Sequence, residues 1–77
     1  MHINKVYKTT SLPIAGVLSL TFTLLDIDKT NPKRALFIFE ESLEVEQMVE
    51  SYWLGELKVD PQEYFSKLKT LKGRLYD

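Results

Sequence analysis

The sequence predicts a small α+β domain in which an antiparallel sheet carries helices on one face, in the order β-α-β-β-α-α. Two observations favour this class. Residues 42–77 contain two apolar patterns at helical spacing, each preceded by a residue that caps helices. Residues 35–39, ALFIF, form a continuous apolar run of strand length, as expected for the central strand of a sheet. Because 77 residues suffice for one small core, we assign residues 1–77 to a single domain.

The first predicted strand covers residues 3–10, where Val, Tyr and Thr are frequent and polar and apolar residues alternate loosely. Lys5 and Lys8 would protect this strand from pairing with other chains, because charged side chains guard a sheet edge. We therefore expect an edge strand here.

Residues 12–20 allow two interpretations. Ser11 can cap a helix and Pro13 is tolerated in a first turn, which predicts a short helix from Leu12 to Leu20. The alternative is one strand from Val17 to Ile27, because VLSLTFTLLDI is rich in β-branched and aromatic residues. Periodicity does not separate the two. The helical interpretation places the following residues on the inner side: Leu12, Ala15, Leu18 and Ser19.

A hairpin follows. Residues 22–28 are predicted as a strand, and the turn residues KTNP separate them from the apolar run at 35–39. The two strands should pair antiparallel. Phe37 stands in the middle of the apolar run, so we expect it at the centre of the core.

Two helices complete the chain and form a predicted αα unit. Ser42 is an expected N-cap, and Gly55 supplies a left-handed C-terminal residue. The second helix begins at Asp60 as N-cap with Pro61 at the first helical position, and Val59 is placed to pack on Tyr64. The predicted inner faces are Val45, Met48, Val49, Tyr52 and Trp53 in the first helix, and Tyr64, Phe65, Leu68, Leu71 and Leu75 in the second.

Composition excludes several kinds of chemistry. The chain has no cysteine and one histidine, His2, so thiolate sites and histidine metal clusters are not expected. Asp26 and Asp28 share a strand face, but two carboxylates fall short of a hard-cation shell. We predict no enzymatic activity, no cofactor and no metal, and a cytoplasmic location. Residues 9–25 carry no charge yet are too short to span a membrane.

Two function classes remain. The first is a protein-interaction module that binds a partner or itself through an apolar patch of Trp53, Leu54 and Leu57, or through the edge at residues 6–10, because Trp and Tyr are enriched in binding hot spots. In the alternative to this patch, Tyr52, Trp53, Leu54 and Leu57 all pack onto residues 35–39. The second class is a nucleic-acid accessory protein with Tyr7 or Phe22 stacking on bases and the following cations on phosphates: Lys33, Arg34, Lys67, Lys69, Lys72 and Arg74.

A specific sequence, YWLGELKVDP, stands at residues 52–61 and is followed by the Leu68, Leu71, Lys72 spacing. With the order of the features above, it resembles a family of small bacterial and phage proteins known as domain of unknown function 5659, and the similarity runs from Tyr7 to Tyr76. The chain departs from the family at residues 21–23, TFT, where a glycine is more usual. The resemblance implies the fold order and a phage or mobile-element setting, and it implies no catalytic residue.

Overall fold

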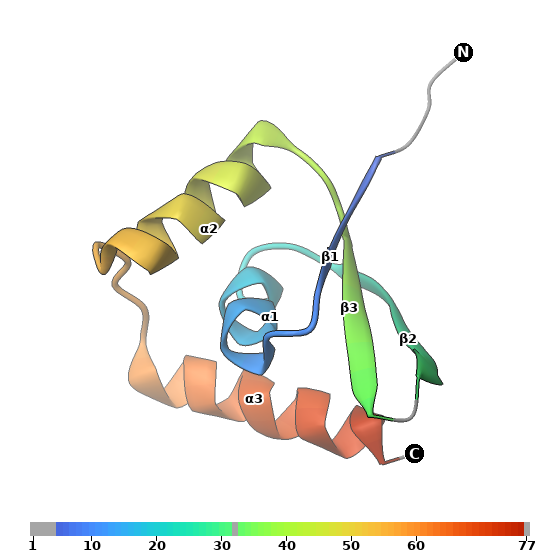
Figure 1. Ribbon diagram of the computed structural model, residues 1–77. Coiled ribbons are helices and arrows are strands. Elements are labelled where there is room, and N and C mark those ends of the chain that lie inside the picture. Colours follow the sequence, from blue (N-terminus) through green and yellow to red (C-terminus); the bar gives the residue numbers. More distant parts are fainter. Residues whose placement is uncertain (1–4, 32, 77) are drawn as a thin grey trace.

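The computed structural model describes residues 5–31 and 33–76. Its elements are β1 (Val6–Thr9), α1 (Leu12–Ser19), β2 (Leu24–Asn31), β3 (Arg34–Glu40), α2 (Leu43–Leu54) and α3 (Pro61–Leu75). The predicted α+β class and the order β-α-β-β-α-α are confirmed, and the helices lie on one side of the sheet (Figure 1).

The sheet has the strand order β1-β3-β2, and both pairings are antiparallel. The apolar run therefore occupies the central strand, as predicted. Phe37 pairs with Thr9 on one side and Ile27 on the other, and its side chain is only 2% exposed. The prediction that Phe37 lies in the core is confirmed, and so is the edge position of β1.

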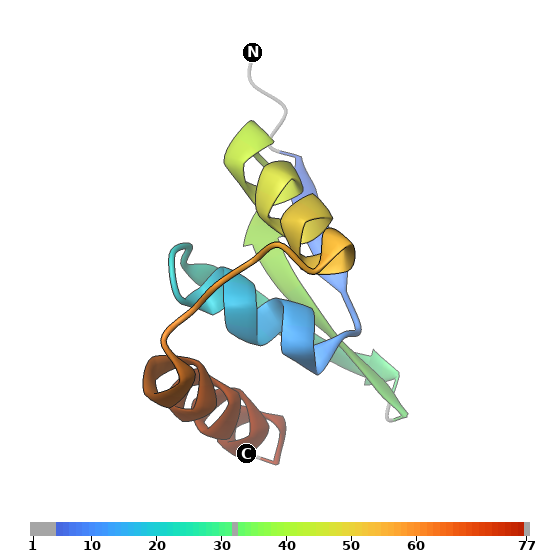
Figure 2. The same ribbon diagram turned by 90° about the vertical axis from the view of Figure 1, so that its left-hand side faces the viewer.

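Helix α1 is the element on which the others pack. Ile14, Ala15, Gly16, Val17 and Leu18 are consecutive and all buried, so the helix is covered around most of its circumference. A helix that is apolar on every side is stable only when neighbours surround it. Figures 1 and 2 show α2 on one side of α1 and α3 on the other, with the sheet beside α1 in Figure 1 and behind it in Figure 2.

The helical interpretation of residues 12–20 is confirmed, and the strand from Val17 to Ile27 is wrong. The Ser11 hydroxyl accepts a hydrogen bond from the Ile14 amide at 3.3 Å, as an N-cap does. At the other end no glycine is needed, because the amides of Thr21 and Phe22 both donate to the Leu18 carbonyl. These bonds delay β2, which begins at Leu24 and not at residue 22.

Other boundaries differ modestly from prediction. Strand β2 continues to Asn31, which pairs with Arg34, so residues 29–31 of the predicted turn belong to the ladder. Pro32 of that turn lies outside the described residues, as do Ile3 and Asn4 of the predicted first strand. The described part of β1 begins at Val6.

The predicted ends of α2 and α3 are confirmed. The Ser42 hydroxyl accepts from the Val45 amide at 3.2 Å, and Gly55 adopts φ 72°, the left-handed conformation that glycine favours. The Asp60 carboxylate accepts from the amides of Gln62 at 2.9 Å and Glu63 at 3.1 Å. Local capping chemistry therefore fixes three of the four ends.

Two details of these helices are corrected. Trp53 and Phe65, predicted on inner faces, are 71% and 62% exposed, because one residue of helix rotates a side chain by roughly 100° and the inner positions are already taken by Tyr52 and Tyr64. The helices α2 and α3 also do not form a pair by themselves. Each packs against α1, which separates them (Figure 2).

Candidate protein-binding surface

The C-terminal end of α2 presents two large apolar side chains to solvent. Trp53 is 71% exposed and Leu54 is 63% exposed, whereas the preceding Tyr52 is half-buried and packs on the core. The Tyr52 and Trp53 rings meet edge to face, with centroids 5.3 Å apart and planes at 83°. Tyr52 thus contacts the indole, while most of the Trp53 side chain stays exposed. We call Trp53 and Leu54 the Trp53–Leu54 patch.

Leu57, the third predicted partner-binding residue, lies in the link between α2 and α3 and is half-buried. The left-handed Gly55 turns the chain away from the axis of α2, so Leu57 does not continue the helix face that carries Leu54. The alternative in which all these residues pack onto residues 35–39 is wrong for Trp53 and Leu54. It holds for Tyr52.

The surroundings of the patch are acidic. Helix α2 contains no basic residue, and Glu44, Glu46 and Glu50 are all exposed on it, with Glu56 exposed just beyond its end. Glu46 and Glu50 precede Trp53 and Leu54 by one or two turns on the same side of the helix. An apolar centre with a carboxylate rim is the result.

The basic residues proposed for nucleic acid do not form one surface. Lys67 and Arg74 lie about two turns apart on the flank of α3 that faces residues 19–24. Lys69 and Lys72 lie on the opposite flank, because helical spacing separates them from Lys67 by more than a quarter of a turn. Lys33 and Arg34 lie at the turn between β2 and β3, where Lys33 shares a hollow with Leu75 and Tyr76 at the C-terminal end of α3.

The aromatic residues proposed to stack on bases are both partly buried. Tyr7 and Phe22 are half-buried and pack against the core cluster. The exposed aromatic rings of α3 and its end are Phe65 and Tyr76, at 62% and 88%. The Lys69 Nζ lies 5.4 Å from the Phe65 ring centroid, within the range of a cation–π contact. This flank of α3 has an apolar centre and a basic rim.

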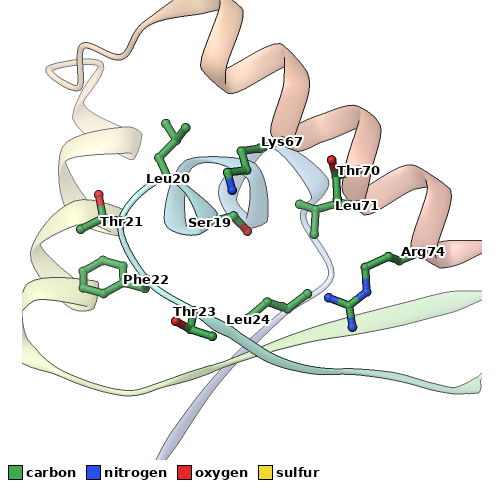
Figure 3. A pocket seen from close by; sticks show the side chains of 10 residues that line it. All are labelled: Ser19, Leu20, Thr21, Phe22, Thr23, Leu24, Lys67, Thr70, Leu71 and Arg74. Atoms are coloured by element: carbon green, nitrogen blue, oxygen red, sulfur yellow. The ribbon is translucent and has the colours of Figure 1, made fainter.

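Sequence reasoning missed one hollow of about 400 Å³, which lies between α3 and the segment that joins α1 to β2. Figure 3 shows Lys67 and Arg74 reaching from α3 toward that segment. The spacing of seven residues between Lys67 and Arg74 is the only sequence signal that could have placed both on one face of α3. The residues opposite them are more than 40 positions earlier in the chain, and nothing local links the two segments.

The side chains of both aspartates in β2 accept hydrogen bonds from backbone amides. Asp26 accepts from the Ile27 amide at 2.8 Å, and Asp28 accepts from the Thr30 amide at 2.9 Å. Hydrogen bonds from the Thr30 side chain and backbone lower the pKa of Asp28, which keeps it ionised. Within residues 5–31 and 33–76, no three metal-ligating side chains come together in a cluster.

The chain is thus a small three-stranded α+β domain with an exposed apolar patch. It belongs to the family described as domain of unknown function (DUF5659), whose model matches residues 4–77. The family resemblance noted in the sequence is therefore confirmed. No curated protein and no solved structure matches the chain. In the described part of the chain, every helix is too short or too polar to cross a membrane.

Proposed function

We propose that this domain is a non-enzymatic interaction module that binds a second copy of itself through the Trp53–Leu54 patch. The observation that carries the proposal is the joint exposure of Trp53 and Leu54, at 71% and 63%, on a domain whose core is small. Covering such a patch contributes roughly 25 cal/mol for each Å² of apolar surface removed from water. The setting we propose is the cytoplasm of a bacterial host, with a phage or mobile element as the source.

Charge complementarity supports a second copy as the partner that covers the patch. The Trp53–Leu54 patch has an acidic rim, whereas the exposed ring of Phe65 lies beside Lys69 and Lys72. These two faces belong to different helices of the same chain and match each other in both polarity and charge. Their contact would be heterologous, with α2 of one copy on α3 of the next.

A heterologous contact can be tested with one variant on each of its two faces. Leu54→Asp should abolish association in light scattering and sedimentation, because it places a carboxylate in the apolar centre beside an acidic rim. Phe65→Asp should abolish it equally, because it removes the other half of the same contact. A mixture of the two variants should form a 1:1 dimer, since each variant retains the face that the other lacks.

Leu43→Asp is the matched control. Leu43 is 65% exposed on the same helix, but it lies about 16 Å from Leu54 along the helix axis. It should associate like the parent. A parent chain that stays monomeric at millimolar concentration would contradict the proposal, and so would a mixture of the two defective variants that stays monomeric.

The nucleic-acid alternative makes a different prediction. Lys69→Glu with Lys72→Glu would then remove a nucleic-acid shift in a gel assay, whereas Leu54→Asp would have little effect. Binding through phosphates would also fall steeply with salt. Retained assembly in Leu54→Asp, together with nucleic-acid binding lost only in the lysine pair, would overturn self-association as the function.

A further inference from the structure

The hollow between α3 and the segment that joins α1 to β2 combines an apolar lining with positive charge. Leu20 after α1, Leu24 in β2 and Leu71 in α3 line it, while Lys67 and Arg74 reach toward it from α3 (Figure 3). Its volume of about 400 Å³ lies within the range of roughly 300–1,000 Å³ that small-molecule sites occupy.

The charged groups of Lys67 and Arg74 are unpaired within the described part of the chain. Neither the Lys67 ammonium nor the Arg74 guanidinium has an ion-pair or hydrogen-bond partner among residues 5–31 and 33–76. The C-terminal end of α1 lies nearby and carries a partial negative charge of about half a unit. Two whole positive charges outweigh it, so the field in the hollow attracts an anion.

We propose that this hollow binds a small organic anion that has one carboxylate and an apolar body. The carboxylate would lie between Lys67 and Arg74, where a guanidinium can hold both of its oxygens. The apolar body would lie on Leu20, Leu24 and Leu71. This site is separate from the Trp53–Leu54 patch and does not depend on self-association.

The proposal is tested by titrating the ¹⁵N-labelled full chain with sodium octanoate at low salt and following amide chemical shifts. Saturable shifts are expected in residues 19–24 and 67–74. Octanamide, which has the same body without the charge, should bind at least about tenfold more weakly, since charge-assisted hydrogen bonds are lost. This comparison uses only the parent chain, so no variant has to fold.

Two double variants then test whether Lys67 and Arg74 bind the octanoate carboxylate. Lys67→Ala with Arg74→Ala should weaken octanoate binding at least about tenfold. Lys5→Ala with Lys33→Ala makes the same change in net charge at exposed residues that do not line the hollow, and it should bind octanoate like the parent. All four side chains belong to exposed residues, so the fold should persist in both variants.

Three outcomes would overturn the proposal. Shifts that spread over the whole surface without saturation would show only detergent-like adsorption. Equal losses in the two double variants would show a response to net charge and not to a site. Lower stability in Lys67→Ala with Arg74→Ala, with no octanoate binding by the parent, would show that these cations only stabilise the end of α1.

Discussion

Gly16 of α1 lies directly against Leu68 of α3. A Cβ atom placed on Gly16 would stand 2.7 Å from Leu68 Cδ2 and 3.1 Å from Tyr64 Cε1. The absence of a side chain at residue 16 therefore sets how closely the two helices approach. The Tyr64 hydroxyl donates to the Pro13 carbonyl at 3.3 Å in the same interface.

The contact predicts non-additive effects of two substitutions. Alanine is favoured over glycine in a helix by about 1 kcal/mol, but in Gly16→Ala the Leu68 side chain must move. In a Leu68→Ala background that obstacle is gone, so Gly16→Ala should be more favourable there by at least about 0.5 kcal/mol. Urea unfolding of the four proteins in the cycle measures this coupling.

Gly73 is the matched control for that cycle. It lies within α3, and a Cβ atom there would meet nothing within 4 Å. Gly73→Ala should therefore stabilise the domain by up to about 1 kcal/mol, with or without Leu68→Ala. Purely additive effects at Gly16 would show that α1 and α3 are not in close contact.

The Asp60 side chain caps α3, so Asp60→Ala should lower the free energy of unfolding by about 1 kcal/mol, because two backbone amides lose their acceptor. Pro61→Gly should cost a further amount of about 0.4–1 kcal/mol through the entropy of the unfolded chain. Asp60→Asn retains an acceptor and should be nearly neutral. A denaturant midpoint unchanged in Asp60→Ala would mean that the helix does not begin at Pro61.

The core position of Phe37 predicts that Phe37→Ala costs about 3–5 kcal/mol in the free energy of unfolding, enough to unfold a domain of marginal stability. Circular dichroism and thermal melting measure the loss. Phe37→Leu keeps most of the buried volume and should stay folded with a lower midpoint. A cooperative transition of Phe37→Ala near that of the parent would refute the assignment of β3 as the core strand.

Tyr64 predicts a pH dependence. Burial, and secondarily the neighbouring Tyr52, raise the pKa of Tyr64 above its usual value of 10.0. The folded state thus holds the phenol proton more tightly than the unfolded chain. The stability that this proton contributes is complete below the unfolded pKa and is lost as the pH rises through the folded pKa.

The test compares the slope of unfolding free energy with pH above about pH 10. The parent should lose stability more steeply than Tyr64→Phe, which cannot ionise. Tyr76→Phe should keep the slope of the parent, because Tyr76 is 88% exposed. Identical slopes in all three proteins would show that Tyr64 ionises as freely as it does in the unfolded chain.

The parts of the fold that sequence reasoning predicted are those that local chemistry determines. Ser42, Gly55 and Asp60 mark helix ends through bonds to residues two to four positions away. Strand β3 is central because five apolar residues in a row cannot lie at a solvated edge. Neither inference needs knowledge of distant contacts.

The parts that it missed depend on those distant contacts. The predicted inner side of α1 included Ser19, whereas the structure buries residues 14–18 without interruption. LPIAGVLS is apolar throughout, so periodicity cannot show how many neighbours cover it. Helix geometry predicted the exposure of Leu54 but did not predict how exposed Trp53 is. The hollow beside Lys67 and Arg74 forms only where α3 crosses the end of α1, so no local pattern predicts it.

The burial of α1 also constrains how the chain is made. Its cover includes α3, and the residues joined by the bond from Tyr64 to Pro13 are 51 positions apart. At synthesis rates of about 5–20 residues per second, α3 follows α1 from the ribosome only after about 3–10 s. Chains of this size collapse within about 100 μs. The interval of synthesis between α1 and α3 is therefore far longer than the time that collapse takes. During synthesis the apolar helix α1 is therefore exposed before α3, one of the elements that cover it, has left the ribosome.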